Sequence, residues 1–264
     1  QRCYIAMKAG KMQVLSMRDD ATSNSTGAVM KIFLGLDDTD ILGSPGTNQI
    51  AMALAIKFKE LGIETTMILR HQLWYDPRVP YTSKNGCASM QLECNSAIDF
   101  QTLGGFCKEF LLTHFVEGSD PGLCLATEDQ AKSLISHSWR TTGEWVNPAE
   151  AIEKAKVSGC LLWSIAGRDH GIVGALAAVG LAASGEQGRV VFHQSGYGEI
   201  RGLISVEKLQ EFGIVVIEES SRMLVSNGIV DLVKKLRPNI RGNEVVLYVE
   251  KGLELNSWMA LKRN

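Results

Sequence analysis

The sequence predicts an α/β fold, with helices packed on a mixed sheet, as a compact domain with a short C-terminal α/β extension. Short apolar runs alternate with longer stretches in which apolar residues recur every three or four positions. Turn residues separate these segments, and no repeat or long linker divides the 264 residues. The hydrophobic fraction of 45% is enough to bury a core.

The first strong strand is expected at Lys31–Gly35 and the first helix at Asn48–Leu61, where Gly62 ends it. The next strands and helices follow the same two periodicities. Strands are predicted at Ile63–Arg70, Gly86–Glu93, Gly122–Ala126, Cys160–Ile165, Arg189–His193, Gly213–Glu218 and Glu244–Glu250. Helices are predicted at Phe100–Phe115, Glu128–His137, Ala149–Ala155, His170–Ala183, Val206–Glu211 and Val230–Leu236.

Three segments follow from this pattern. Residues 1–29 have little apolar periodicity and a Ser/Thr/Asn-rich end, so we expect a disordered extension. Residues 30–204 carry the motifs described below and form the catalytic domain. Residues 205–264 alternate helix and strand and are predicted to extend that domain.

The formal net charge is −2, so nucleic-acid binding would need a local basic patch. The six cysteines form no CxxC and have no zinc-like spacing to histidine, which favours buried free thiols in a reducing compartment. Apolar runs are too short to span a membrane. We therefore expect a cytoplasmic protein without a membrane partner, and self-association is left open.

The most informative motif is the acidic turn Asp37, Asp38 and Asp40 after the first strand. Carboxylates this close repel one another unless a cation lies between them, and Mg²⁺ prefers oxygen ligands. If the turn stays extended, Asp38 and Asp40 share one face and Asp37 points elsewhere. The alternative is an ordinary solvated turn.

A glycine-containing loop, Gly43–Asn48, leads from this turn into the first helix. Gly46, Thr47 and Asn48 would present backbone N–H groups to phosphate oxygens. Thr47 or Asn48 acting only as a helix N-cap is the simpler interpretation. No GxxxxGK[ST] and no GxGxxG motif is present.

Two further loops carry cations. Arg78 and Lys84 lie among Trp74, Tyr75 and Tyr81, a mixture that can stack a base and clamp phosphates, although a Pro-bounded surface loop is an equal alternative. In AGRDHG, Gly167, Arg168 and Gly171 precede a helix, so Arg168 is a candidate phosphate ligand. Asp169 is a candidate metal ligand or cap, and His170 is more typical of a structural residue.

In this order, the motifs resemble the N-terminal kinase-like domain of the archaeal agmatinyl-cytidine synthetases, which modify the wobble cytidine of an isoleucine tRNA. The resemblance covers Met30–Ala183 and rests on the motifs LDDTD, DPRVPY, SDPG and the glycine-rich segment Gly167–Gly180. It implies an ATP- and Mg²⁺-dependent enzyme in which phosphorylation activates an acceptor. Thr47 falls where the family has a threonine that becomes phosphorylated.

On this basis Asp37, Asp38, Thr47 and Arg168 are predicted to be catalytic, and Asp37, Asp38 and Asp40 to bind the metal. The predicted ATP-binding residues are Gly46, Asn48, Arg78, Lys84, Gly167 and Gly171.

The sequence also departs from the family. Asp76 replaces an asparagine, Lys84 replaces an arginine, and the zinc-ribbon cysteines of the family's tRNA-binding modules are not found through Asn264. We therefore expect a stand-alone relative with a small-molecule or RNA acceptor, and tRNA stays open as a partner. Two alternatives remain: a metal-dependent phosphatase with an aspartate nucleophile in Asp38–Asp40, and a nucleotide-binding module without catalysis.

Overall fold

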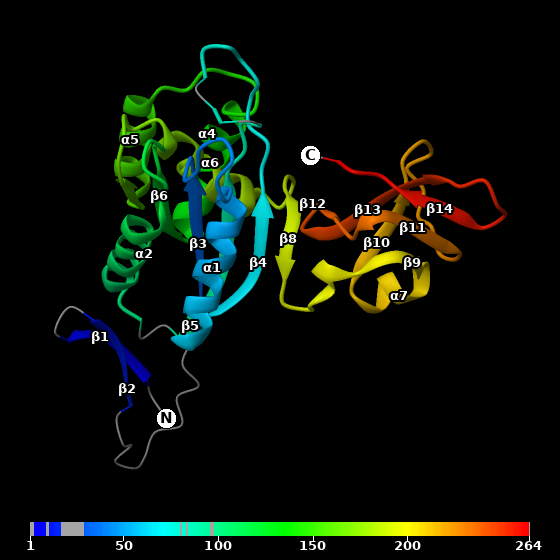
Figure 1. Ribbon diagram of the computed structural model, residues 1–264, viewed down its shortest axis with the longest axis horizontal. Helices are drawn as coiled ribbons and strands as arrows, with labels where there is room; N and C mark the ends of the chain where they lie inside the picture. The colour runs from blue at the N-terminus through cyan, green and yellow to red at the C-terminus, as the bar shows by residue number, and fades with distance from the viewer. Residues whose placement is uncertain are drawn as a thin grey trace.

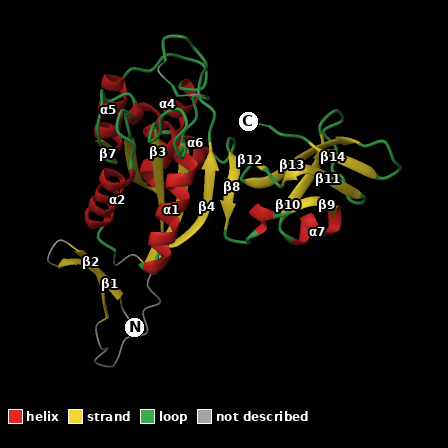
Figure 2. Ribbon diagram, in the orientation of Figure 1, coloured by secondary structure: helices red, strands yellow, loops and turns green. Residues whose placement is uncertain are grey.

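The computed structural model describes residues 3–8, 11–16, 29–79, 81–82, 84–95 and 98–263. Two lobes lie side by side: one holds helices on both faces of a sheet, and the other consists mainly of strands (Figures 1 and 2). Strands β1 (Cys3–Lys8) and β2 (Lys11–Ser16) pair in a separate antiparallel sheet. The rest of the extension predicted for residues 1–29 falls almost entirely outside the described residues.

The first lobe is built on six strands, and every neighbouring pair in it is antiparallel. Their spatial order is β7 (Leu161–Ser164), β6 (Gly122–Thr127), β3 (Val29–Asp37), β5 (Ala88–Asn95), β4 (Glu64–Arg70) and β8 (Arg189–His193). The strand that ends in the acidic turn, β3, therefore lies in the interior of the sheet.

Helices cover both faces because the side chains of β3 alternate. Ile32, Leu34 and Leu36 are fully buried in a core shared with α1 (Thr47–Glu60) and α2 (Phe100–His114). Phe33 belongs to the core on the opposite face, which includes α6 (Gly171–Ser184). Three shorter helices lie beside α6: α3 (Glu128–Ser133), α4 (Ile135–Arg140) and α5 (Pro148–Ser158).

Helix α6 lies unusually close to the sheet. A side chain at Gly35 would overlap the carbonyl oxygen of Ala175, and one at Gly174 would overlap the Asp37 carboxyl group. Ten of the 14 residues of α6 are Gly, Ala or Val, and these small side chains allow the helix to approach the sheet closely. The N-terminus of α6 is thereby held against the end of β3.

The second lobe contains β9 (Arg201–Ser205), α7 (Val206–Glu211), β10 (Ile214–Glu218), β11 (Ile229–Lys235), β12 (Asn239–Arg241), β13 (Glu244–Lys251) and β14 (Ser257–Ala260). The 3₁₀ turn η1 (Tyr197–Glu199) precedes it. Pairs β10–β13 and β11–β14 are parallel, so the whole sheet is mixed, as predicted. Strand β12 pairs with β8 and joins the two lobes.

Two sequence-based assignments were wrong. Val230–Leu236 is part of strand β11, because its residues alternate between exposed and buried with the two-residue period of a strand. The single helix predicted at Glu128–His137 is divided at Leu134 into α3 and α4. Strands β9, β12 and β14 had no counterpart among the predicted elements.

Other features agree with the sequence. Five of the six cysteines, from Cys87 to Cys160, are buried free thiols. None of the described helices has the length and apolar character to cross a membrane.

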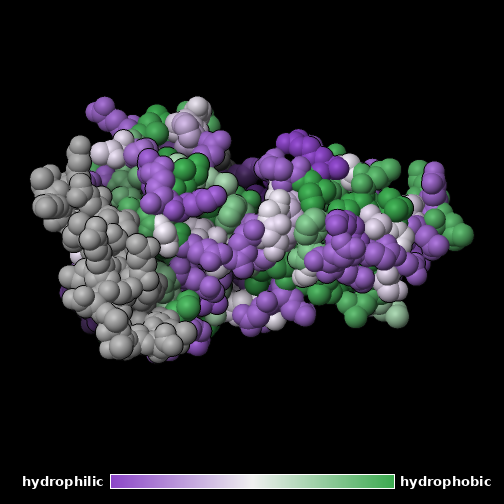
Figure 3. Space-filling model, turned by 90° about the horizontal axis from the view of Figure 1, so that it is seen from below, coloured by the Kyte–Doolittle hydropathy of each residue, from purple (hydrophilic) through white to green (hydrophobic). Residues whose placement is uncertain are grey.

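Hydrophobic residues gather at the far end of the second lobe (Figure 3), where the turn after β13 leaves Leu253 and Leu255 almost fully exposed.

Candidate functional site

The acidic turn lies where β3 ends beside β6 and next to the N-terminus of α6. Asp37 is the last residue of β3 and pairs with Gly122. Asp38 has a left-handed backbone (φ +49°), so the chain leaves the strand direction there. The turn does not stay extended, and the expectation that Asp38 and Asp40 share one strand face does not apply.

Burial and mutual repulsion raise the pKa values of two of these carboxyl groups. The pKa of Asp37 rises to about 8, mainly because it is buried and also because Asp38, Asp40 and Asp120 repel its charge, against a hydrogen bond from the Asp38 backbone. Burial, Asp120 and Asp40 raise the pKa of Asp38 to about 6. The cluster therefore disfavours full ionisation unless a cation is present.

Asp120 is a fourth member of this cluster that the sequence did not single out. Its N–H donates to the Asp38 carbonyl oxygen (3.2 Å), and its Oδ2 accepts from the His170 N–H (3.0 Å). Its Oδ1 is buried without a hydrogen-bond partner. An unsatisfied buried carboxylate oxygen costs free energy, because it has lost its hydrogen bonds to water.

The glycines of the AGRDHG motif make room for Asp120. A side chain at Gly167 or Gly171 would overlap atoms of Asp120, and Gly167 has a positive φ of 88°. Their observed role is close packing beside the cluster. Arg168 is exposed and lines neither of the two cavities described next.

A polar cavity of about 160 Å³ opens above the acidic turn. Its walls bring together carboxylates, the N-terminus of α1 and two cations, Arg70 and Lys84. The lining residues are Asp37, Asp38, Asp40, Gly46, Thr47, Asn48, Arg70, Tyr81, Thr82, Lys84, Asn85 and Gly86. Arg70 is buried and donates to Gln72 Oε1 (3.1 Å) and to the Lys84 carbonyl oxygen (3.0 Å), which fixes its guanidinium group.

Thr47 is positioned for more than capping. The N-cap of α1 is Gly46, whose N–H donates to Gln49 Oε1 (3.1 Å), so the interpretation of Thr47 as the N-cap was wrong. The Thr47 hydroxyl donates to Asp40 Oδ1 (3.1 Å) and accepts from the Thr39 hydroxyl (3.1 Å). Next to it, Asn48 Oδ1 is buried and has no hydrogen-bond partner.

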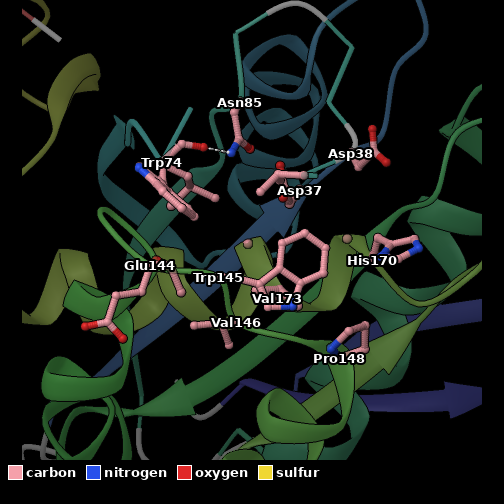
Figure 4. A pocket seen from close by; sticks show the side chains of 15 residues that line it. Asp37, Asp38, Trp74, Asn85, Glu144, Trp145, Val146, Pro148, His170 and Val173 are labelled. Atoms are coloured by element: carbon pink, nitrogen blue, oxygen red, sulfur yellow. Dashed lines mark hydrogen bonds between the residues drawn. The ribbon is translucent and has the colours of Figure 1, made fainter. Parts of the chain in front are cut away.

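A second, more apolar cavity of about 60 Å³ adjoins the first, and Asp37, Asp38 and Asn85 line both (Figure 4). Figure 4 shows Trp74, Asn85 and Asp37 along one side of it and Glu144 and Val146 along the other. We call it the aromatic cavity. Its remaining lining residues are Leu73, Val79, Thr141, Trp145, Pro148, His170, Gly171, Val173 and Gly174.

Arg78 does not line the aromatic cavity but contacts two tryptophans that do, Trp74 and Trp145. Its Nε lies 2.6 Å from Asp76 Oδ1, and its guanidinium group lies over the rings of Trp74 (5.4 Å) and Trp145 (6.0 Å). Asp76 therefore neutralises the arginine that the sequence suggested as a phosphate ligand.

The structure brings a group of the predicted residues together at the polar cavity: the three aspartates, Gly46, Thr47, Asn48 and Lys84. Sequence reasoning did not single out Thr82, Asn85, Asp120 or Trp145 as site residues. Asp120 lies in a motif that the sequence did reveal, SDPG, whereas Trp145 had no signal because its partners are distant in sequence.

Metal binding at this site would use few protein ligands. Among the described residues, no three His, Cys, Asp or Glu side chains lie close enough together to hold an ion. Mg²⁺ commonly takes only one or two carboxylates and completes its octahedron with waters and substrate phosphates. Asp37, Asp38 and Asp40, which line the polar cavity, fit that mode of binding.

Comparison with known proteins yields matches among solved structures alone. No protein-family model matches the sequence, and no curated protein is significantly similar to it. The fold is similar to that of TiaS, a tRNA agmatidine synthetase, in its apo form, with 22% identity, a TM-score of 0.48 and coverage of 57% of this chain. The complex of TiaS with its tRNA and ATP, and a tRNA fluorescent labeling enzyme, each give 24% identity, a TM-score of 0.49 and the same coverage. The matched part is about a third of the length of those proteins (35% and 36%).

Proposed function

We propose that this protein is an ATP- and Mg²⁺-dependent enzyme that activates an acceptor by phosphoryl transfer. The observation that carries the proposal is the polar cavity, in which aspartates face the N-terminus of α1, Arg70 and Lys84. Carboxylates suit a divalent cation, and helix N–H groups and cations suit phosphate oxygens, so the two walls together fit a metal–triphosphate.

In this proposal one or two of the carboxylates Asp37, Asp38 and Asp40 would hold the cation, and waters and phosphate oxygens would complete its coordination. The cation would neutralise charge that develops on the transferred phosphoryl group. Gly46, Thr47 and Asn48 would orient the phosphates, and Arg70 and Lys84 would balance their charge. The fixed position of Arg70, held by Gln72 and the Lys84 carbonyl, costs no reorganisation when phosphate binds.

Thr47 is the proposed phosphoryl acceptor on the protein. Its hydroxyl already donates to Asp40 Oδ1, which can take the proton as the oxygen attacks. The Thr39 hydroxyl donates to the Thr47 hydroxyl oxygen and thereby holds the Thr47 side chain in one rotamer. The same position corresponds to the phosphorylated threonine of the family that the sequence resembles.

The aromatic cavity is the proposed place for the final acceptor. It shares Asp37 and Asp38 with the polar cavity, so a group bound there lies next to the phosphates. Trp74 and Trp145 offer flat apolar surface to a planar ring, and Glu144 and Asn85 offer polar atoms at its edge. A heterocyclic carbonyl compound, free or within RNA, fits this combination.

Phosphate release from γ-labelled ATP with Mg²⁺ tests the proposal. We expect turnover in the wild type and its loss in Asp38→Asn. Asp129→Asn is the matched control, because it removes the same charge from an exposed position on α3. Absence of ATP turnover combined with hydrolysis of a phosphomonoester would instead support a phosphatase. Nucleotide binding without turnover would support a regulatory module.

A further inference from the structure

A groove of about 300 Å³ in the second lobe contains four cationic residues: Lys234, Lys235, Arg237 and Lys262. The buried Leu232 and Leu247 line it as well and give it an apolar floor. We call this site the basic groove. It lies outside the polar and aromatic cavities, and the proposed chemistry makes no use of it.

An irregularity in β11 creates the basic groove. Residues 232–235 all line it, although successive residues of a regular strand face opposite sides. The register of β11 against β9 shifts between Asp231 and Lys235, and Val233 has a left-handed backbone with φ +60°. This conformation is strained for a β-branched residue, and the Val233 N–H bond to Asp231 Oδ1 (2.8 Å) holds it.

The cations of the groove are mostly not neutralised. Lys235 pairs with Glu199 (3.2 Å). In the part of the chain that the structure describes, no carboxylate lies within ion-pair distance of Lys234, Arg237 or Lys262. Because the chain as a whole carries a net charge of −2, this is a local concentration of positive charge on a slightly acidic protein.

The positive region continues toward the polar cavity. The segment after β14 runs back toward the first lobe (Figure 1), and the Leu261 N–H donates to the Tyr248 carbonyl oxygen (2.8 Å). The positive charges of Lys84 and then Arg189, both outside the groove, lower the pKa of Lys262, and Arg237 and Lys234 of the groove act in the same direction. Lys84 itself lines the polar cavity, so cations connect the two sites.

We propose that the basic groove binds the phosphate backbone of a single-stranded nucleic acid, which continues past Lys262 and Lys84 toward the polar cavity. One phosphate would need fewer cations, whereas a strand presents phosphates at regular intervals along such a path. The apolar floor suits sugars or bases. Binding in the groove requires no ATP, but the direction of the strand rests on the proposed function.

The test measures binding of a fluorescently labelled single-stranded RNA of mixed sequence, without ATP, by anisotropy across a salt series. The double variant Lys234→Gln/Lys262→Gln removes two exposed charges from the groove. We expect roughly tenfold weaker binding, and a salt slope shallower by about 1.4, because each phosphate contact on a single strand contributes about 0.7. The double variant Lys132→Gln/Lys208→Gln removes two exposed charges elsewhere and should bind like the wild type.

Three results would overturn the inference: no binding by the wild type, equal weakening by the control variant, or displacement of the RNA by polyglutamate or tripolyphosphate at the same charge concentration. Binding of a single-stranded DNA of the same sequence shows whether the groove distinguishes ribose from deoxyribose. A preference for RNA or for DNA supports the proposed site. The ATP assay is separate, so RNA binding without turnover would contradict the proposed function and leave the groove in place.

Discussion

Two buried polar clusters lie in the first lobe, and they differ in how completely their hydrogen bonds are made. In the first, His71 Nδ1 contacts Gln187 Oε1 (2.7 Å) and His71 Nε2 contacts Ser89 Oγ (2.8 Å). Gln187 also donates to the Gln72 carbonyl oxygen (3.0 Å). Burial lowers the pKa of His71 to about 4, so its ring stays neutral.

The second cluster is the acidic turn with Asp120. It is buried too, yet one carboxylate oxygen of Asp120 has no partner, and the pKa values of Asp37 and Asp38 are raised. Asp37 and Asp38 line both cavities, whereas neither His71 nor Ser89 lines either one. A serine–histidine–glutamine arrangement resembles a nucleophile and its base, but complete burial makes it a structural network.

The two clusters contain similar residue types, but the completed network lies away from both cavities, whereas Asp37 and Asp38 line them. Completed networks fix a fold, because each buried group already has its partner. An incomplete network needs something from outside the chain. The predictions below alter one cluster and use the other as its reference.

The largest effect is expected from Asp38→Asn. It should abolish stabilisation by Mg-ATP while it keeps or raises the melting temperature without ligand, because it removes one of several repelling charges. Thermal unfolding with and without Mg-ATP measures both quantities. Asp129→Asn should retain the full ligand-dependent shift. The same shift in Asp38→Asn would show that the acidic turn does not hold the metal.

The next effect concerns Thr47. Thr47→Val removes the hydroxyl, keeps the shape of the side chain, and should abolish incorporation of label from γ-labelled ATP into the segment Gly43–Lys57. Thr47→Ser should keep the label. Because Thr39 and Asp40 lose a partner, Thr47→Val should also cost about 1–3 kcal/mol in the free energy of unfolding.

Thr113→Val provides the reference for Thr47. It removes a hydroxyl that bonds within α2, far along the chain from the cavity. It should leave labelling intact. Label that persists on Gly43–Lys57 in Thr47→Val would assign the phosphate to another residue and leave Thr47 with a structural role.

Local sequence patterns specified the first lobe well. Strand β3, helices α1, α2 and α6, and the acidic turn all follow from periodicity and turn residues that lie within a few positions of one another. They also pointed to polar residues that the structure brings together at the polar cavity, among them Asp37 and Thr47. The second lobe was less predictable, because β11 has apolar residues at both two- and three-residue spacing and only its neighbours β9 and β14 select the strand.

The walls of the site were predictable only in part, since they come from segments distant in sequence. Asp120 reaches Asp38 because β6 pairs with β3, and Trp145 reaches the aromatic cavity from the loop between α4 and α5. The ion pair of Arg78 was unpredictable for the opposite reason: its partner Asp76 is two residues away, but pairing in a loop depends on a conformation that no periodicity reports.

A third prediction changes the completed network. His71→Leu leaves the buried Ser89 hydroxyl without its histidine partner and removes one hydrogen bond from the half-buried Gln187, so it should lower the free energy of unfolding by about 2–3 kcal/mol. Because His71 lines neither cavity, the Mg-ATP-dependent thermal shift should be unchanged in the folded variant. Chemical denaturation measures the first quantity and thermal unfolding the second. Loss of the ligand shift in a well-folded variant would contradict the separation of the two clusters.

The smallest effect is a pair of opposite pH dependences, measured in the presence of EDTA and without nucleotide. The pKa of Asp37 rises from 3.8 to about 8 on folding, so the folded state holds the extra proton in that range and stability falls as pH rises through it. The pKa of His71 falls from 6.5 to about 4, so its contribution is present above 6.5 and is lost as pH falls toward 4.

Between pH 6.5 and 8 only the aspartate effect operates, and one proton corresponds to about 1.4 kcal/mol per pH unit. The wild type should therefore lose about 1–2 kcal/mol across this window, while Asp37→Asn should be nearly flat. Below pH 6.5 the raised pKa of Asp38, about 6, acts in the same sense as that of Asp37 and opposes the effect of His71. The contribution of His71 is therefore the difference between the wild-type and His71→Leu curves, and it should grow as pH falls from 6.5 toward 4. Chemical denaturation at a series of pH values gives all three curves, and a wild-type curve as flat as that of Asp37→Asn above pH 6.5 would mean that the carboxylate cluster is already neutralised within the chain.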